Sequence, residues 1–253
     1  MQKQKAIFNW SGGKDSALCL HKVLTLGEHS VSCLLTSVNE QYRRISMHGV
    51  RIELLDQQAA SIAIPLVKML TPEMPDMKTY ETIMKETLVR LKNSGMQVCI
   101  FGDIFLEDLR MYRENKLAEI NLKAIFPLWK IPTSQLIREF IDLGFKAIIV
   151  CVNDRFLDRR FVGRIIDDSF LKDLPDNVDP CGENGEFHSF VYDGPIFSKP
   201  IEFKLGEIVH RKYSPTQQDS SSQYTCNSSN PNPFDNGFWY GDLIPVSEVG
   251  RTV

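Results

Sequence analysis

The feature that most constrains the fold is a short apolar run that ends on two adjacent glycines and is followed by a helical pattern. Residues 5–10 are largely apolar and rich in β-forming side chains, and the chain then reads Ser11-Gly12-Gly13. From Asp15 to Leu26, apolar residues recur at helical spacing. The sequence therefore predicts a strand, a glycine loop and a helix in direct succession, which is how many α/β domains begin.

The alternation of strands and helices continues to about residue 128. Further strands are predicted at residues 31–38, 65–70, 98–101 and 124–126, and helices at 50–64, 80–92 and 106–121. The strands are apolar on both faces, which is typical of a parallel sheet covered by helices on both sides. We therefore expect an α/β fold built on a five-stranded parallel sheet.

The pattern changes after Pro127, where short strands occur among Pro, Gly and Asn residues. We expect helices at 133–143 and 163–174, and strands at 145–152, 187–191, 201–208 and 238–243. The segment 213–233 is rich in Ser, Gln, Asn and Pro, so it is expected to be a surface loop. The sequence thus predicts an N-terminal domain of residues 1–128 and a smaller α+β domain of residues 129–253.

Composition restricts the class of partner. The 253-residue chain has a formal net charge of -3, so it has no global basic field to attract a phosphate backbone, and nucleic acid is disfavoured as a partner. Six cysteines lie far apart without a C-x-x-C pair, which indicates reduced thiols. No secretory signal and no run of about 18 apolar residues is present, so a cytoplasmic protein without a membrane partner is expected.

The glycine loop carries the clearest chemistry in the sequence. Adjacent Gly12 and Gly13 let the backbone approach an anion, and the following helix adds its N-terminal amides and the positive end of its dipole. Lys14 contributes a positive charge, and the hydroxyl groups of Ser11 and Ser16 add hydrogen-bond donors. This arrangement favours a phosphate ligand, and the alternative is a serine-rich cap on an ordinary helix.

A second chemical motif occupies residues 179–190, which read DPCGENGEFHSF. Glycines beside Glu183 and Glu186 predict a tight, exposed turn that presents both carboxylates on one side. Such a pair suits magnesium, an ammonium ion or general acid-base chemistry, although a solvated acidic turn fits the spacing equally well. Cys181 raises the alternative of sulfur transfer, but it has no C-x-x-C partner. His188 is either a site residue or a satisfied polar neighbour.

Both motifs resemble those of known enzymes. The string Ser11–Ser16 is that of the pyrophosphate-binding loop of ATP pyrophosphatases, and residues 179–190 resemble the G-E-G-G-E-F-E-T-F motif of the diphthine–ammonia ligase family. Asn184, His188 and Ser189 depart from that pattern. The resemblance extends from about residue 5 to residue 200 and includes further matches in order at Met47-His48-Gly49, Gly102-Asp103-Ile104, Pro127-Leu128-Trp129, residues 143–146 and residues 163–167.

The resemblance implies a parallel sheet of the adenine-nucleotide-binding, HUP-like type and an ATP-dependent amide ligase that uses ATP and magnesium. Such an enzyme adenylates a carboxylate, here diphthine-like, and transfers ammonia to it, with release of AMP and pyrophosphate. The acceptor is expected to be the diphthine of elongation factor 2 or a small-molecule carboxylate, and homo-oligomer formation is left open. A tRNA-modifying thiolase or ligase and a non-catalytic adenine-nucleotide-binding module are the alternatives.

The resemblance also implies roles for individual residues. Lys14, Glu183 and Glu186 are expected to be catalytic, and Asp15 is expected on the metal side. The three departures fall in the motif nearest the presumed acceptor, so ATP handling transfers from the family better than substrate identity does. The residues expected to bind the nucleotide are Ser11, Gly12, Gly13, Lys14, Asp15, Ser16, His48, Gly102 and Asp103.

Overall fold

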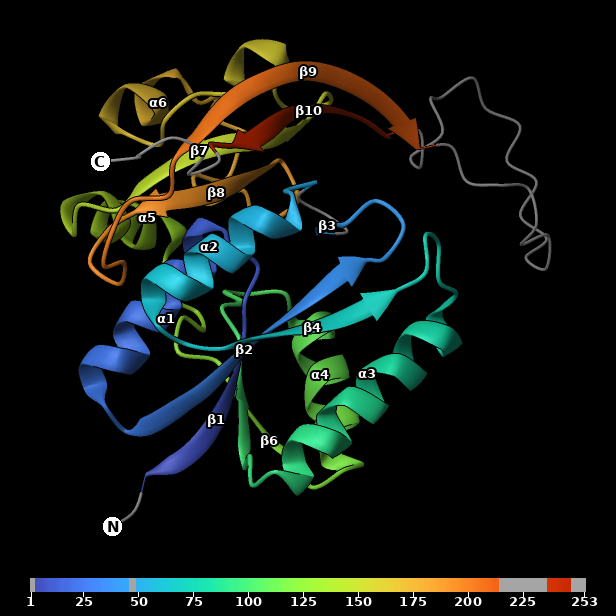
Figure 1. The fold of residues 1–253 in the computed structure, drawn as a ribbon. Coiled ribbons are helices and arrows are strands. Elements are labelled where there is room, and N and C mark those ends of the chain that lie inside the picture. The colour runs from blue at the N-terminus through green and yellow to red at the C-terminus, as the bar shows by residue number, and fades with distance from the viewer. Residues whose placement is uncertain (1–2, 46–48, 214–235, 247–253) are drawn as a thin grey trace, which may run out of the picture.

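The computed structural model describes residues 3–45, 49–213 and 236–246, which form two sheets with their covering helices (Figure 1). His48, one of the residues expected to bind nucleotide, lies outside the described residues. The strands of the first sheet are β1 (Gln4–Asn9), β2 (His29–Asn39), β3 (Arg44–Ile45), β4 (Leu66–Thr71), β5 (Val98–Ile100) and β6 (Lys123–Ile125). Its helices are α1 (Lys14–Leu26), α2 (Ile52–Ile62), α3 (Met77–Asn93) and α4 (Glu107–Ala118).

The first sheet confirms the predicted five-stranded parallel arrangement. Its parallel strands lie in the order β4-β2-β1-β5-β6, and the two-residue strand β3 adds an antiparallel pair to β2. The strand order reverses between β1 and β5. In open α/β sheets, ligands bind at such a switch point, outside the carboxyl ends of the strands.

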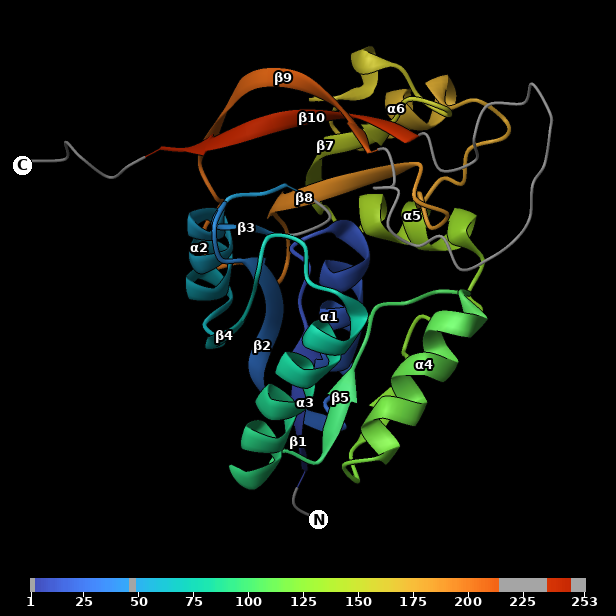
Figure 2. The same ribbon diagram turned by 90° about the vertical axis from the view of Figure 1, so that its right-hand side faces the viewer.

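Helices cover both faces of this sheet (Figure 2). Helices α1 and α2 pack on one face, where Leu18 and Leu54 join Phe8 of β1 in one buried cluster. Helices α3 and α4 pack on the other face, where Leu88 and Leu117 join Ile7 in a second cluster. Because Ile7 and Phe8 are adjacent in β1, their side chains point to opposite faces. Strand β1 is therefore apolar on both faces because helices bury both of its faces.

The second sheet is antiparallel, has the order β8-β7-β10-β9, and lies above α1 and α2 in Figure 1. Its buried side chains belong to the same cluster as those of α1 and α2, so one core extends between the two sheets. The elements of this part of the chain are α5 (Thr133–Asp142), β7 (Lys146–Asn153), η1 (Arg159–Phe161), α6 (Asp168–Asp173), β8 (Phe187–Asp193), β9 (Phe203–Tyr213) and β10 (Asn236–Pro245).

One expected helix is shorter than its sequence pattern. The prediction of a helix over residues 163–174 was wrong for the first five residues, since helix α6 begins at Asp168. Gly163 has a φ of 86°, and the Gly163 amide and Arg164 carbonyl both pair with Ile149 of β7. The Asp167 side chain then caps the helix by accepting from the Phe170 amide.

Two further expectations concern the chain as a whole. Residues 214–233 of the expected polar loop lie outside the described residues, and the domain boundary at residue 128 stays a prediction. Within the described ranges, no helix combines the length and apolarity needed to cross a membrane.

Candidate active site

The glycine loop connects β1 directly to α1, as the sequence predicts. Gly12 has a φ of 77°, which is the left-handed region that favours glycine, and Gly13 precedes the helix in an extended conformation. The N-cap residue, Gly13, has no side chain, and the Ser189 hydroxyl accepts a hydrogen bond from the Lys14 amide in the first turn of α1 at 3.2 Å. The Ser16 hydroxyl donates to the Gly13 carbonyl at 2.9 Å and accepts from Ser11 Oγ at 3.1 Å. The loop therefore presents a helix N-terminus flanked by hydroxyl groups.

Lys14 and Asp15 form a close ion pair at the start of α1. Lys14 Nζ lies 2.6 Å from Asp15 Oδ2, and the lysine side chain is only 5% exposed. Burial alone would lower the pKa of Lys14, but the negative charge of Asp15, with smaller effects from Cys181 and Glu183, raises it above its ordinary value. The buried ammonium group therefore stays charged near the loop backbone, where it can neutralise a bound phosphate.

The loop after β5 lies against the glycine loop. A Cβ added at Gly102 would lie 3.2 Å from the Asp15 carbonyl carbon and oxygen, so a larger residue there would push the two segments slightly apart. Asp103 follows and pairs with Arg113 of α4, whose Nε lies 3.2 Å from Asp103 Oδ2. Burial raises the pKa of the Asp103 carboxyl. Gly102 and Asp103 are thus at the carboxyl edge of the parallel sheet, as expected for residues near a nucleotide.

The Glu183 side chain connects the turn of residues 179–186 to the loop after β5. Its Oε1 accepts hydrogen bonds from the backbone amides of Ile104, at 2.9 Å, and Phe105, at 3.4 Å, in the loop after β5. Burial raises its pKa to about 7, and the charges of Lys14 and Asp15 are close enough to act on that pKa. Glu183 therefore lies at the same edge as the glycine loop, with a pKa suited to proton transfer near neutral pH.

Glu186 has a different environment, which corrects the expectation of an exposed turn with both carboxylates on one side. It is 1% exposed. Its Oε1 accepts from the Asp179 amide at 3.1 Å and from Asn184 Nδ2 at 3.0 Å, and its Oε2 accepts from the Asn184 amide at 2.9 Å. The carboxylate thus holds its own turn together. A catalytic role for Glu186 stays a prediction.

Cys181 is buried beside the loop, and His188 is half-buried there. The Cys181 thiol donates to the Thr133 carbonyl at 3.4 Å, and burial raises its pKa well above the ordinary value. A thiol of raised pKa is a poor nucleophile at neutral pH, which disfavours sulfur transfer. Burial, followed by the charge of Lys14, lowers the pKa of His188 to about 4, so its imidazole is neutral.

The second sheet contacts the loop through the edge strand β8. The Val191 amide donates to the Gly12 carbonyl at 2.9 Å, and the Lys14 amide donates to Ser189 Oγ at 3.2 Å. In α2, the Gln58 side chain also hydrogen-bonds to Gly12 and Val191. The sequence prediction missed Gln58. The signal available was a polar residue on the apolar stripe of a helix, three positions after Leu55 and four after Leu54.

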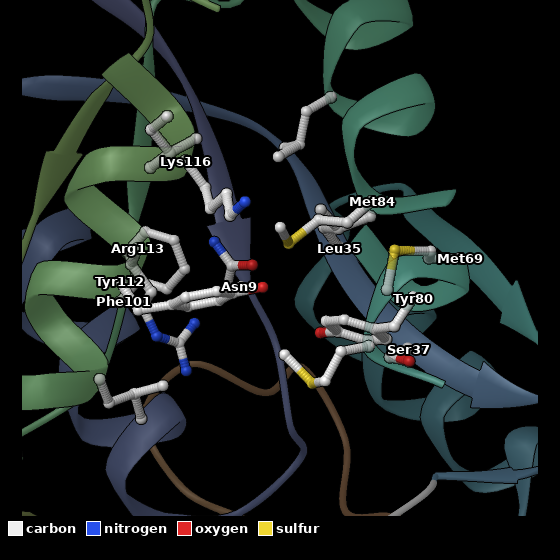
Figure 3. Close-up of a pocket in the computed structure, with 14 residues that line it drawn as sticks. Asn9, Leu35, Ser37, Met69, Tyr80, Met84, Phe101, Tyr112, Arg113 and Lys116 are labelled. Atoms are coloured by element: carbon white, nitrogen blue, oxygen red, sulfur yellow. The ribbon is translucent and has the colours of Figure 1, made fainter. Parts of the chain in front are cut away.

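A cavity of about 410 Å³ lies between α3 and α4 (Figure 3). It reaches the carboxyl ends of three parallel strands at Asn9, Ser37 and Phe101. The Arg113 guanidinium lies at its wall, 4.4 Å from the centroid of the Phe101 ring. The sequence prediction missed this cavity because α3 and α4 are separate in the chain. Its lining is Asn9, Leu35, Ser37, Met69, Met77, Tyr80, Met84, Leu88, Phe101, Leu109, Tyr112, Arg113, Lys116 and Leu117.

Strand order, glycine loop and buried cation together define an α/β domain with an anion-binding type of loop at the carboxyl edge of a parallel sheet. Two family models match this chain, the diphthamide synthase N-terminal domain over residues 4–124 and the diphthamide synthase C-terminal domain over residues 132–217. The chain belongs to the diphthine–ammonia ligase family, and it is an ATP-dependent ligase of that type.

Curated relatives agree with this membership. The human diphthine–ammonia ligase is 26% identical over 231 residues, which covers 79% of this chain and 82% of the human one. The Danio rerio diphthine–ammonia ligase is 23% identical over 226 residues, with 79% and 86% coverage. The Schizosaccharomyces pombe protein of the same name is 26% identical over 218 residues, but the match covers only 36% of its length.

Among solved structures, the U34-tRNA thiolase NcsA from Methanococcus maripaludis with its 4Fe-4S cluster is 20% identical to this chain. The match covers 56% of this chain and 57% of the thiolase, with a TM-score of 0.35. A similarity of this extent supports no conclusion about the site.

Proposed function

We propose that the chain adenylates a diphthine-like carboxylate with ATP and transfers ammonia to it, with release of AMP and pyrophosphate. The observation that carries this proposal is the position of Glu183. Its carboxylate is held by the loop after β5, at the same edge of the sheet as the Lys14 ammonium. A phosphate-binding loop beside a carboxylate of raised pKa suits an acyl activation followed by proton transfer.

The residues at this edge fit ATP. The glycine loop places a helix N-terminus and a charged lysine at this edge, and the Ser11 and Ser16 hydroxyl groups, which now donate within the loop, would turn toward a bound phosphate. The cavity between α3 and α4 offers an apolar and aromatic lining at the ends of β1, β2 and β5. It lies beside the strand-order reversal, where ligands of open α/β sheets bind. We assign the adenine to the mouth of this cavity and the phosphates to residues 11–16.

Magnesium would be held mainly by the phosphates of ATP. Asp15 is the carboxylate nearest the start of α1, and its side chain is 30% exposed. No group of three or more metal-binding side chains occurs within the described ranges. This donor set fits a magnesium ion that takes one protein carboxylate and several phosphate and water oxygens. When bound, the ion would neutralise charge on the phosphates and orient them.

Glu183 is assigned to the amide-forming step. In that step, the nitrogen of ammonia forms a bond to the activated acyl carbon while the bond from that carbon to the AMP oxygen breaks. The nitrogen must also lose a proton, and the Glu183 carboxylate is positioned to accept it. Lys14 contributes earlier, when negative charge accumulates on the departing pyrophosphate.

An acceptor assay tests this function. The purified full chain is incubated with ATP, magnesium, an ammonium salt and elongation factor 2 that carries diphthine. Mass spectrometry of the modified histidine should show conversion of its carboxylate to an amide, with one AMP formed per amide. AMP formation that depends on ammonium but leaves diphthine unchanged would indicate a different carboxylate. Absence of AMP formation in every mixture would contradict the adenylation proposal.

A further inference from the structure

Gln58 is a buried amide that joins three segments of the chain. Its side chain lies on α2 and is 0% exposed. Its Oε1 accepts from Trp10 Nε1 at 2.9 Å, and its Nε2 donates to the Gly12 carbonyl at 3.1 Å and the Val191 carbonyl at 2.6 Å. Both donors of the amide are therefore used, as buried polar groups require.

The three partners specify the orientation of the amide. If its oxygen and nitrogen exchanged places, the NH₂ group would face the Trp10 N–H, and the oxygen would face two carbonyl oxygens. Donors would then meet a donor, and an acceptor would meet acceptors. The network thus selects a single arrangement, and a carboxylate at position 58 would not reproduce it.

The Gly12 carbonyl is the point at which this network reaches the glycine loop. It accepts from both Gln58 Nε2, at 3.1 Å, and the Val191 amide, at 2.9 Å. Because a trans peptide is planar, its N–H points away from its C=O. Fixing the Gly12 carbonyl toward Gln58 and β8 therefore turns the Gly13 amide away from them, to the side of the loop where it donates to Ser11 Oγ at 3.3 Å. A Cβ at Gly12 would lie 2.8 Å from Gln58 Oε1, so the close approach itself requires glycine.

We infer that Gln58 is a positioning residue that pre-organises the glycine loop for phosphate and fixes β8 against it. Gln58 faces the loop backbone from the side of α2, so it acts through the Gly12–Gly13 peptide. Trp10 holds the acceptor end of the amide in place. A loop whose peptide planes are set before binding loses less entropy when it binds an anion. The inference rests on the proposed use of ATP phosphates at residues 11–16.

Three variants test the role of Gln58. Gln58→Met keeps the side-chain length and removes all three hydrogen bonds, and Trp10→Phe removes only the indole donor. Gln57→Met is the matched control, because Gln57 is the neighbouring glutamine on α2 and is half-buried. Thermal unfolding of each full-length variant establishes that it is folded before binding is measured.

Calorimetry with magnesium-ATP, inorganic pyrophosphate and adenosine then separates loop effects from general destabilisation. Folded Gln58→Met should lose about tenfold or more in affinity for ATP and pyrophosphate, with adenosine affinity changed by less than about threefold, on the scale of a lost hydrogen bond. Trp10→Phe should show a smaller loss of the same kind, and Gln57→Met should match wild type. If Gln58→Met does not fold, the Trp10→Phe result decides the matter.

Unchanged ATP and pyrophosphate affinity in a folded Gln58→Met protein would overturn the inference. So would equal losses for ATP and adenosine, since a purely structural role would weaken both. If only Trp10→Phe folds, unchanged ATP and pyrophosphate affinity in that variant, or equal losses for ATP and adenosine, would overturn the inference. If the wild-type chain binds neither ATP nor pyrophosphate, the proposed function fails instead, and the two failures are thereby distinguished.

Discussion

The glycine loop, residues 11–16, and the carboxylate turn, residues 179–186, both combine glycines with charged side chains, but their polar groups face different ways. In the loop, the Gly12 carbonyl is turned toward Gln58 and Val191, and the Lys14 ammonium lies at the start of α1 beside the loop backbone. In the turn, the Glu186 carboxylate is turned inward and is fully used by the turn itself. Glu183 alone of the two glutamates reaches the glycine-loop edge.

The difference shows that residue type and spacing do not decide whether a charged side chain is available for chemistry. Glu183 and Glu186 are three positions apart, and each is next to a glycine. One carboxylate satisfies local amides and is 1% exposed, whereas the other crosses to a distant loop. The hydrogen-bond partners therefore distinguish a carboxylate that is used within its own turn from one that contacts the loop after β5.

The substitution with the greatest predicted loss of activity is in the glycine loop. Lys14→Ala should lower kcat/KM by about a thousandfold and weaken ATP binding severely, because it removes the buried cation that we assign to the phosphates. It should also destabilise the protein, since Asp15 would lose its partner. Steady-state kinetics and calorimetry measure both effects.

Lys22→Ala is the matched control for Lys14→Ala, because Lys22 lies on the same helix and pairs with Glu139. It should leave ATP affinity near the wild-type value. Equal ATP affinity in wild type and Lys14→Ala would show that the glycine loop does not bind the phosphates.

A smaller loss of activity is expected when Glu183 of the carboxylate turn is replaced. Glu183→Gln should lower kcat by about a hundredfold while ATP affinity stays within about threefold, because the variant loses a base and keeps the side-chain shape. Single-turnover kinetics and calorimetry separate the two quantities. A loss of ATP affinity as large as that of Lys14→Ala would place Glu183 in a metal site instead.

Glu186→Gln tests whether the second glutamate stabilises its own turn. An amide at position 186 would place an NH₂ group against amide donors of Asp179 or Asn184, so the free energy of unfolding should fall by about 2–3 kcal/mol. Denaturant titration of Glu186→Gln and Glu183→Gln measures it. If Glu186→Gln is as stable as wild type and has lost turnover, Glu186 has the catalytic role first predicted for it.

The smallest effect is a pH dependence assigned to Glu183. Its pKa of about 7 lies above the ordinary value of 4.5, so the folded protein holds this proton more tightly than the unfolded chain does. The resulting stabilisation is fully present below about pH 4.5 and is lost as pH rises through about 7. As a base, Glu183 must be ionised, so kcat/KM should rise with pH and level off above about 7.

A pH–rate profile with the Glu183→Gln variant as control measures this dependence. The variant should lose the rise near pH 7. A wild-type midpoint near pH 4.5 would show that the Glu183 environment is wrongly assigned.

Local patterns predicted the glycine loop and the parallel sheet well. Two-sided apolar strands and the break at Gly12 and Gly13 are encoded in consecutive residues, so they are visible without the fold. The burial of Glu186 was not predictable, because Gly182 and Gly185 before it are equally compatible with an exposed turn. Gln58 and the cavity between α3 and α4 depend on contacts between residues far apart in the chain.

The products of ATP cleavage distinguish adenylation from cleavage of the terminal phosphate. Phosphorus NMR of the full chain turning over ATP with magnesium, ammonium and the diphthine-bearing factor would identify them. We expect AMP and pyrophosphate in equal amounts, because the proposed mechanism has the loop hold the pyrophosphate portion while the carboxylate takes the adenylyl group. ADP and orthophosphate as the main products would contradict it.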